Sequence, residues 1–188
     1  MKIEDVKTPE ELLKFMDEHI QYGFTDGDGN IYTMEDDEAF EEGVKTVWRL
    51  GTAHDLIKGG YGHCWDQVEF EREWFLNHGY VVKTIYIWFE LDHENPYTTH
   101  TSLIYEEDDK YCLFEHADYM NRGISKFDTY KDALFRQIEN HLKTNRSVGP
   151  MTKDVVECLH IYEYDRPPYG IDMFGFIDFI MDEGTKIL

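Results

Sequence analysis

The chain has 188 residues, with 39 Asp or Glu against 18 Lys or Arg, so its formal net charge is -21 at pH 7. A surface this acidic repels phosphate backbones and anionic lipids, so we expect neither nucleic-acid binding nor membrane binding. Hydrophobic residues make up 41% and aromatic residues 15% of the chain, which is enough to close one core. We therefore expect a single domain over residues 1–188.

The three cysteines, Cys64, Cys112 and Cys158, are an odd number in a sizeable chain and do not indicate a disulfide framework. The first residues carry no apolar signal segment, and no apolar run approaches the length that spans a membrane. We therefore expect a cytoplasmic protein with reduced thiols. No motif in the chain predicts a cofactor.

The first third of the chain reads mainly as helices. Thr8 and the following Pro9 are typical of a helix start, and the apolar spacing predicts a helix to about residue 19. The rest of this part contains a turn between two short strands at 26–30, an acidic run at 34–42 and a short helix capped by Thr52 that ends near residue 58.

The remaining two thirds read as one helix followed by strands and two later helices. Residues 65–78 predict an amphipathic helix with apolar side chains on one side and charged ones on the other, ended by Gly79. The later predicted elements are strands at 81–91, 98–105, 110–116 and 154–164, a loop at 92–97, a helix after Thr129 and a helix at 171–181. Helices followed by an antiparallel sheet predict an α+β fold.

Cys64 stands at the junction between a glycine-rich loop and a predicted helix, in the stretch Gly-Gly-Tyr-Gly-His-Cys-Trp-Asp-Gln at 59–67. Glycines allow a substrate to approach the backbone closely, and a helix N-terminus lowers the pKa of a thiol. The free N–H groups there can also hold an oxyanion. A lone cysteine is more often a buried structural residue, so the nucleophile hypothesis depends on a partner base.

His100 and Glu115 are the predicted base and its orienting acid. We expect the strands within 98–116 to form a hairpin with either a two-residue loop at Glu107-Asp108 or a four-residue loop. Both registers place Glu115 opposite His100, so that the two side chains share a face. A loop of odd length places Glu115 on the other face and removes it from the site.

Two nearby residues compete for these roles. His116 is a rival base or a rival orienting group. Asp118 replaces Glu115 as the orienting acid if the chain bulges.

Three segments resemble the transglutaminase-like branch of the papain-like cysteine superfamily. Its motifs are a Gly-x-Cys-aromatic helix start, a strand His followed by hydrophobic residues, and an acid in the next strand. Here they read Gly62-His63-Cys64-Trp65, His100-Thr101-Ser102-Leu103-Ile104-Tyr105 and Tyr111-Cys112-Leu113-Phe114-Glu115. More closely, the chain resembles an uncharacterised bacterial transglutaminase-like family, in Cys64-Trp65-Asp66-Gln67-Val68-Glu69, Tyr97-Thr98-Thr99-His100-Thr101, Phe114-Glu115-His116, Tyr22-Gly23-Phe24 and Arg122-Gly123-Ile124.

The resemblance implies a papain-like core in which the nucleophile helix packs on an antiparallel sheet. It also implies a thiol hydrolase or acyltransferase in which Cys64 attacks an amide or thioester, His100 is the base and Glu115 orients it. The substrate is then a peptide or a small amide. The superfamily's acid is usually Asp or Asn, and Lys58 stands where papain-like proteases carry their oxyanion Gln. The candidates for oxyanion or substrate contacts are Gln21, Tyr22, Trp65 and His116.

Two other function classes are compatible with the sequence. A non-catalytic interaction domain that retains the fold would bind a basic partner through its acidic surface. A zinc site would use His63, Cys64, His100 and His116, but the chain lacks the Cys-x-x-Cys and helical His-x-x-x-His spacings typical of such sites. We therefore predict no metal, and the sequence predicts no oligomeric state.

Overall fold

The computed structural model describes residues 2–89, 98–144 and 157–188. The loop predicted at 92–97 and the strand ends predicted at 90–91 and 154–156 lie outside the described residues.

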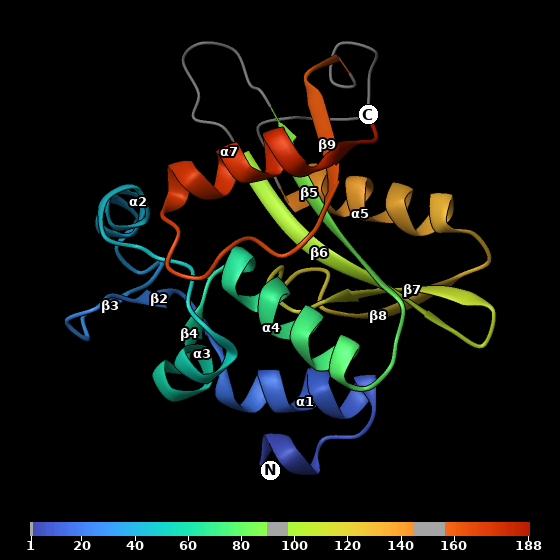
Figure 1. The fold of residues 1–188 in the computed structure, drawn as a ribbon, viewed down its shortest axis with the longest axis horizontal. Coiled ribbons are helices and arrows are strands. Elements are labelled where there is room, and N and C mark those ends of the chain that lie inside the picture. The colour runs from blue at the N-terminus through green and yellow to red at the C-terminus, as the bar shows by residue number, and fades with distance from the viewer. Residues whose placement is uncertain (1, 90–97, 145–156) are drawn as a thin grey trace.

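A six-stranded antiparallel sheet forms the centre of the fold, in the order β10-β9-β5-β6-β7-β8 (Figure 1). Its strands are β5 (Val82–Phe89), β6 (Thr98–Glu107), β7 (Lys110–Glu115), β8 (Gly123–Phe127), β9 (Leu159–Tyr164) and β10 (Thr185–Lys186). The sequence predicted β5, β6, β7 and β9, and it missed β8 and β10. The predicted α+β class is confirmed.

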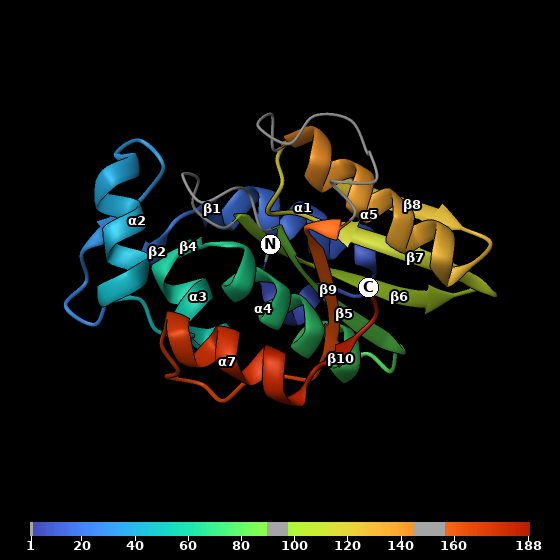
Figure 2. The same ribbon diagram turned by 90° about the horizontal axis from the view of Figure 1, so that it is seen from above.

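Helices cover both faces of this sheet (Figures 1 and 2). One face packs against α1 (Pro9–His19), α4 (Cys64–Asn77) and α7 (Met173–Glu183), and the other packs against α5 (Tyr130–Thr144). Among the elements whose bounds lie in the described residues, the other helices are η1 (Ile3–Asp5), α2 (Asp37–Thr46) and α3 (Ala53–Gly59). None of the described helices combines the length and the apolar character needed to cross a bilayer.

Two short strands connect the end of α1 to the glycine loop. β1 (Gln21–Tyr22) pairs in parallel with β4 (Tyr61–Gly62), and Tyr22 stands beside Gly62. Gly62 is required here, because a Cβ on it would lie 2.2 Å from a methyl group of Leu56. Between β1 and β4 the chain forms the predicted hairpin, with strands β2 (Phe24–Thr25) and β3 (Ile31–Tyr32).

Helix α4 is buried on nearly all sides. The sequence predicted an amphipathic helix with its charged side in solvent, and this prediction is wrong. Its apolar residues pack against α1 and the sheet, and Trp65 packs against α7. The charged side chains Glu69, Glu71 and Arg72 are also buried. Arg72 offsets part of this cost by donating to Glu69 at 3.0 Å and to the Tyr164 carbonyl at 3.1 Å.

The β6–β7 hairpin has a different register from the one we predicted. Glu107 pairs with Lys110, so the two-residue loop is Asp108-Asp109 instead of Glu107-Asp108. Leu103 pairs with Phe114, and continuing this register sets Ser102, not His100, opposite Glu115. A shift of two residues preserves the face of every side chain, so Glu115 still lies on the same side as His100.

The loop of this hairpin gives a stability prediction. Asp108 and Asp109 have φ angles of 50° and 59°, in the left-handed region that glycine adopts without strain. We expect Asp109→Gly to raise the free energy of unfolding by about 0.5–1 kcal/mol in urea denaturation. Asp109→Val should lower it, because a β-branched residue resists a positive φ.

The matched control is Asp165→Gly, at an exposed position outside any positive-φ turn. It should leave stability unchanged or reduce it slightly. Stabilisation by Asp109→Val would contradict the register.

Candidate active site

Cys64 is the first residue of α4, and its neighbours close the buried end of the helix. The His63 ring accepts the Trp65 N–H through Nδ1 at 3.1 Å, and Asp66 accepts the His63 N–H at 3.2 Å. This reciprocal pair is a capping box in which an imidazole replaces the usual hydroxyl. Cys64 is 6% exposed. The thiol therefore lies at the positive end of the helix, largely out of water.

His100 and Glu115 form a buried pair beside this helix end. His100 Nε2 lies 2.7 Å from Glu115 Oε2, and Glu115 is 3% exposed. The second carboxylate oxygen, Oε1, accepts the Asp118 N–H at 2.9 Å. Both carboxylate oxygens are thus engaged. The pair leaves Nδ1 of His100 as the nitrogen available to a neighbouring group.

The Cys64 thiol interacts with His100, and this interaction changes the pKa of both groups. Burial raises the pKa of Cys64, but hydrogen bonding to His100 and His63 and their charge outweigh it and lower the pKa to about 6. Burial lowers the pKa of His100, but the Glu115 carboxylate and the thiol raise it well above its ordinary value. The two shifts together favour a thiolate–imidazolium pair near neutral pH.

His63 is a second imidazole next to the thiol. Its ring stacks on Trp48 at 5.0 Å between centroids and is fully enclosed. Because Nδ1 accepts the Trp65 N–H, the ring proton of the neutral form is on Nε2. The sequence suggested His63 only as a zinc ligand. A His-x-x-Asp spacing at the helix start was the available signal for its capping role.

Tyr22 is the oxyanion candidate that the fold brings next to the nucleophile. The β1–β4 pairing sets it beside Gly62, two residues before Cys64. Burial and the neighbouring Cys64 raise the pKa of Tyr22, so the phenol keeps its proton. Gln21 precedes Tyr22 in the same short strand, so its side chain points to the opposite side from Tyr22 and away from the thiol.

The two other candidates, Trp65 and His116, have partners elsewhere. Trp65 is buried in the core, where its indole stacks on Phe176 at 4.4 Å. The side chain of His116 faces Gln67 Oε1 at 2.6 Å and Asp17 at 3.4 Å. Burial and Arg122 lower the pKa of His116 to about 4, so it is neither the base nor the orienting group.

Asp118 does not orient His100. Its carboxylate accepts the Met120 N–H at 3.1 Å, the Asn121 amide at 2.7 Å and the Thr144 hydroxyl at 2.7 Å. These bonds hold the loop after β7. Strand β7 pairs regularly up to Glu115, without the bulge that would have made Asp118 the orienting acid.

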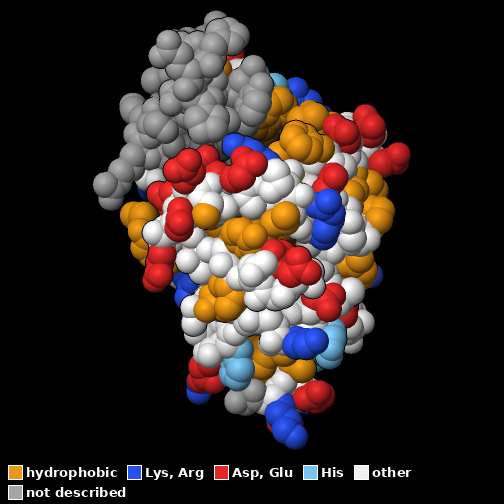
Figure 3. Space-filling view, turned by 90° about the vertical axis from the view of Figure 1, so that its left-hand side faces the viewer, with side chains coloured by type: hydrophobic (Ala, Val, Ile, Leu, Met, Phe, Trp, Pro, Cys, Tyr) orange, Lys and Arg blue, Asp and Glu red, His pale blue; other side chains and the backbone are white. Residues whose placement is uncertain are grey.

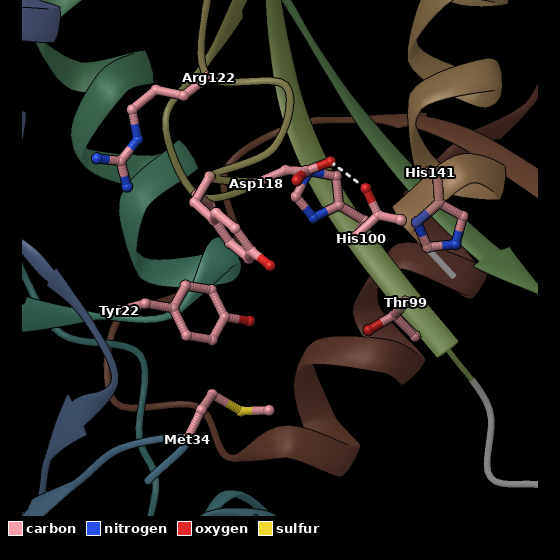
Figure 4. Close-up of a pocket in the computed structure, with 10 residues that line it drawn as sticks. Tyr22, Met34, Thr99, His100, Asp118, Arg122 and His141 are labelled. Carbon is pink, nitrogen blue, oxygen red and sulfur yellow. Dashed lines mark hydrogen bonds between the residues drawn. The ribbon is translucent and has the colours of Figure 1, made fainter. Parts of the chain in front are cut away.

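A pocket of about 520 Å³ opens beside His100 (Figure 4). Tyr22 and His100 are the predicted residues in its wall. The full lining is Tyr22, Met34, Thr99, His100, Ala117, Asp118, Tyr119, Arg122, His141 and Thr144. The sequence missed Met34, Tyr119 and His141, because they come from a loop before α2, a loop after β7 and α5, and no local spacing relates these segments.

The zinc alternative is not supported by the arrangement of its ligands. His116 is engaged with Gln67 and Asp17, away from the group formed by His63, Cys64 and His100. Among the described residues, no three His, Cys, Asp or Glu side chains gather in a way that could hold a metal ion.

Comparison with protein-family models finds no family that matches this chain. Comparison with curated proteins finds no relative with significant similarity. Function is therefore argued from the geometry of the site.

The pKa of Cys64 gives a direct test of the site. With a pKa of about 6 the thiol is mostly ionised at pH 7, and its reaction with iodoacetamide should fall about tenfold per unit below pH 6. An ordinary thiol with a pKa of about 8.5 is ionised to the order of 0.3% at pH 6. Alkylation is followed by mass spectrometry of the peptide that contains Cys64.

His100→Phe removes the main group that lowers this pKa and leaves burial, which raises it. The reaction should then be slow at pH 6 and should increase through the alkaline range. Cys112, which is also buried, is the internal control in the same digest. A midpoint near 8.5 for Cys64 in the unsubstituted protein would contradict the thiolate pair.

Proposed function

We propose that this protein is a thiol hydrolase or acyltransferase that forms an acyl-enzyme on Cys64. The observation that carries the proposal is the buried pair of His100 Nε2 and Glu115 Oε2 at 2.7 Å, next to a Cys64 thiol whose pKa His100 lowers. A nucleophile next to a base, with the base held by a third group, is the arrangement that activates Cys and Ser nucleophiles in unrelated folds.

The proposal includes a transglutaminase-like version of the papain-like core. The support is the order of the parts along the chain: Cys64 at the start of a buried helix, His100 in a strand, and Glu115 in the next strand. The antiparallel sheet packed against α4 agrees with this arrangement. The acid is Glu where the superfamily usually has Asp or Asn, and its longer side chain still reaches the imidazole.

The first chemical step uses the thiolate that the pair holds. The proton of the thiol has passed to His100, and the sulfur attacks the carbonyl carbon of an amide or thioester. A carbon–sulfur bond forms while the carbonyl π electrons move to oxygen. When the tetrahedral intermediate collapses, His100 gives its proton to the leaving amine or thiol. Water or an amine then attacks the acyl-enzyme and releases Cys64.

Two donors near the thiol can stabilise the oxyanion. The N–H of Cys64 is at the first turn of α4, where backbone N–H groups have no partner within the helix. The Tyr22 hydroxyl is on the residue beside Gly62 and keeps its proton. A carbonyl oxygen bound between these two donors would accept a hydrogen bond from each.

Removal of any member of the triad should nearly abolish turnover. We expect Cys64→Ala, His100→Asn and Glu115→Gln each to lower kcat by about 10³-fold or more, because the groups act as a unit. The measurement is hydrolysis of p-nitrophenyl acetate, together with detection of acetyl-Cys64 by mass spectrometry after rapid acid quench.

The matched control is Glu106→Gln, which changes an exposed carboxylate of β6 in the same hairpin, outside the pocket. It should retain most of the activity. Equal rates for the unsubstituted protein and Cys64→Ala would contradict the proposal and favour a non-catalytic interaction domain.

The hydroxyl of Tyr22 has its own test. We expect Tyr22→Phe to lower kcat by about 10²- to 10³-fold with little change in KM, because an oxyanion donor acts mainly in the transition state. The thiolate titration of Cys64 should stay near its original midpoint. A change in KM alone would assign Tyr22 to substrate binding instead.

A further inference from the structure

The pocket next to His100 is built largely from aromatic and apolar side chains. Tyr22 faces its hollow from one side, with Met34 below it in the view of Figure 4, and Tyr119 also lines the pocket. Thr99, His100 and His141 form the opposite side. A volume of about 520 Å³ is in the range of ligand pockets, which combine apolar walls with a few placed polar groups.

The two ionic groups in the wall are already compensated by the protein. Asp118 accepts three hydrogen bonds, including one from Thr144 that Figure 4 shows. Arg122 donates to the His116 carbonyl at 2.8 Å and to Asp17 at 2.8 Å. An anionic ligand group would have to break the Arg122–Asp17 pair or be buried without a counter-ion. The partners of Asp118 are all neutral donors, so a cationic group could pair with it only at the cost of leaving water. The apolar side chains of the wall favour a neutral group.

His141 is a polar side chain in this wall with one ring nitrogen, Nε2, that has no hydrogen-bond partner among the described residues. It is 7% exposed, and that nitrogen is buried. Its ring lies parallel to His100 at 6.0 Å between centroids. Burial and the neighbouring His100 lower the pKa of His141 to about 3, so it is neutral at physiological pH. A neutral imidazole offers one donor and one acceptor, which matches an amide.

The mouth of the pocket continues onto an exposed apolar surface. Met34 is 53% and Tyr119 is 77% exposed, and Met120 next to Tyr119 is also exposed. Apolar side chains appear among acidic ones on the face that carries α2 (Figure 3). Exposed apolar residues that extend a pocket indicate a ligand longer than the pocket, such as a polypeptide. The overall charge of -21 attracts cations, but the one carboxylate of the wall, Asp118, already accepts three hydrogen bonds.

We propose that the substrate is a polypeptide segment whose aromatic or aliphatic side chain, next to the reacting carbonyl, fills the pocket between Tyr22, Met34 and Tyr119. In this arrangement His141 hydrogen-bonds to a backbone amide of the segment. The inference rests on the proposed function, because it assigns the pocket to the substrate of Cys64.

The experiment measures the rate at which Cys64 is alkylated by three N-acetyl amino acid chloromethyl ketones that differ only in their side chain: phenylalanine, lysine and aspartate. The thiolate displaces chloride in each case, so the rate ratio reports recognition and not reactivity. We expect the phenylalanine reagent to react at least tenfold faster than the other two. Met34→Ala and Tyr119→Ala, at exposed positions, should each reduce this preference severalfold.

His141→Phe keeps the ring and removes the hydrogen bond. We expect it to slow the phenylalanine reagent about tenfold, His141→Gln to recover most of the rate, and the surface control His54→Phe to have no effect. Iodoacetamide, which is too small to fill the pocket, should label Cys64 equally in all of them. If His141→Phe slows iodoacetamide to the same extent, the role of His141 is structural and its assignment fails.

The failure of this inference is distinguishable from failure of the proposed function. Equal rates for the three reagents, or a fastest lysine reagent, overturn the apolar pocket while leaving the nucleophile in place. Slow labelling of Cys64 at pH 6 by every reagent, iodoacetamide included, overturns the proposed function itself, and with it the inference.

Discussion

The site depends on the burial of the first turn of α4. Helix ends carry unpaired N–H groups, and burying them is costly unless side chains or a ligand accept them. Here the His63 ring and Asp66 satisfy two of these groups, and Cys64 stands between them. The same burial reduces the dielectric around the thiol, which strengthens its interaction with His100. A helix end on the surface could carry the same caps. The thiolate–imidazolium pair would be weaker there, because water would screen the two charges.

The four histidines around this helix end have the same chemistry and different protonation, which shows how their surroundings set their roles. His100 faces a carboxylate and a thiol, and its pKa is raised. His116 and His141 are buried near positive charge, and their pKa values fall to about 4 and about 3. His63 accepts the Trp65 N–H through Nδ1, so this nitrogen caps helix α4 and is not available to the thiol. Burial lowers the pKa of His63, but Asp66 and the Cys64 thiol raise it above its ordinary value. His100 differs from His63 in the buried Glu115 carboxylate that lies 2.7 Å from its Nε2.

The antiparallel sheet explains why the predicted pairing of His100 and Glu115 was useful despite a wrong register. The two-residue loop lies one residue later along the chain than expected, at Asp108-Asp109, where both residues adopt positive φ, and this shifts every cross-strand partner by two residues. Side chains repeat every two residues along a strand, so an even shift moves Glu115 along the face without moving it to the other side. The pair then meets diagonally, and the length of Glu helps to span that distance. A shift of one residue would have removed the acid from the site.

Local patterns in the sequence determined the helix caps, most strands, the helix start at Cys64 and the shared face of His100 and Glu115, because each of these depends on residues a few positions apart. The tertiary structure alone decided that Tyr22 lies next to the nucleophile, since that placement needs the parallel pairing of β1 with β4 across about forty residues. It also decided the pocket of Met34, Tyr119 and His141, and the burial of the charged side of α4. These features depend on which elements pack together, and no short-range spacing records that.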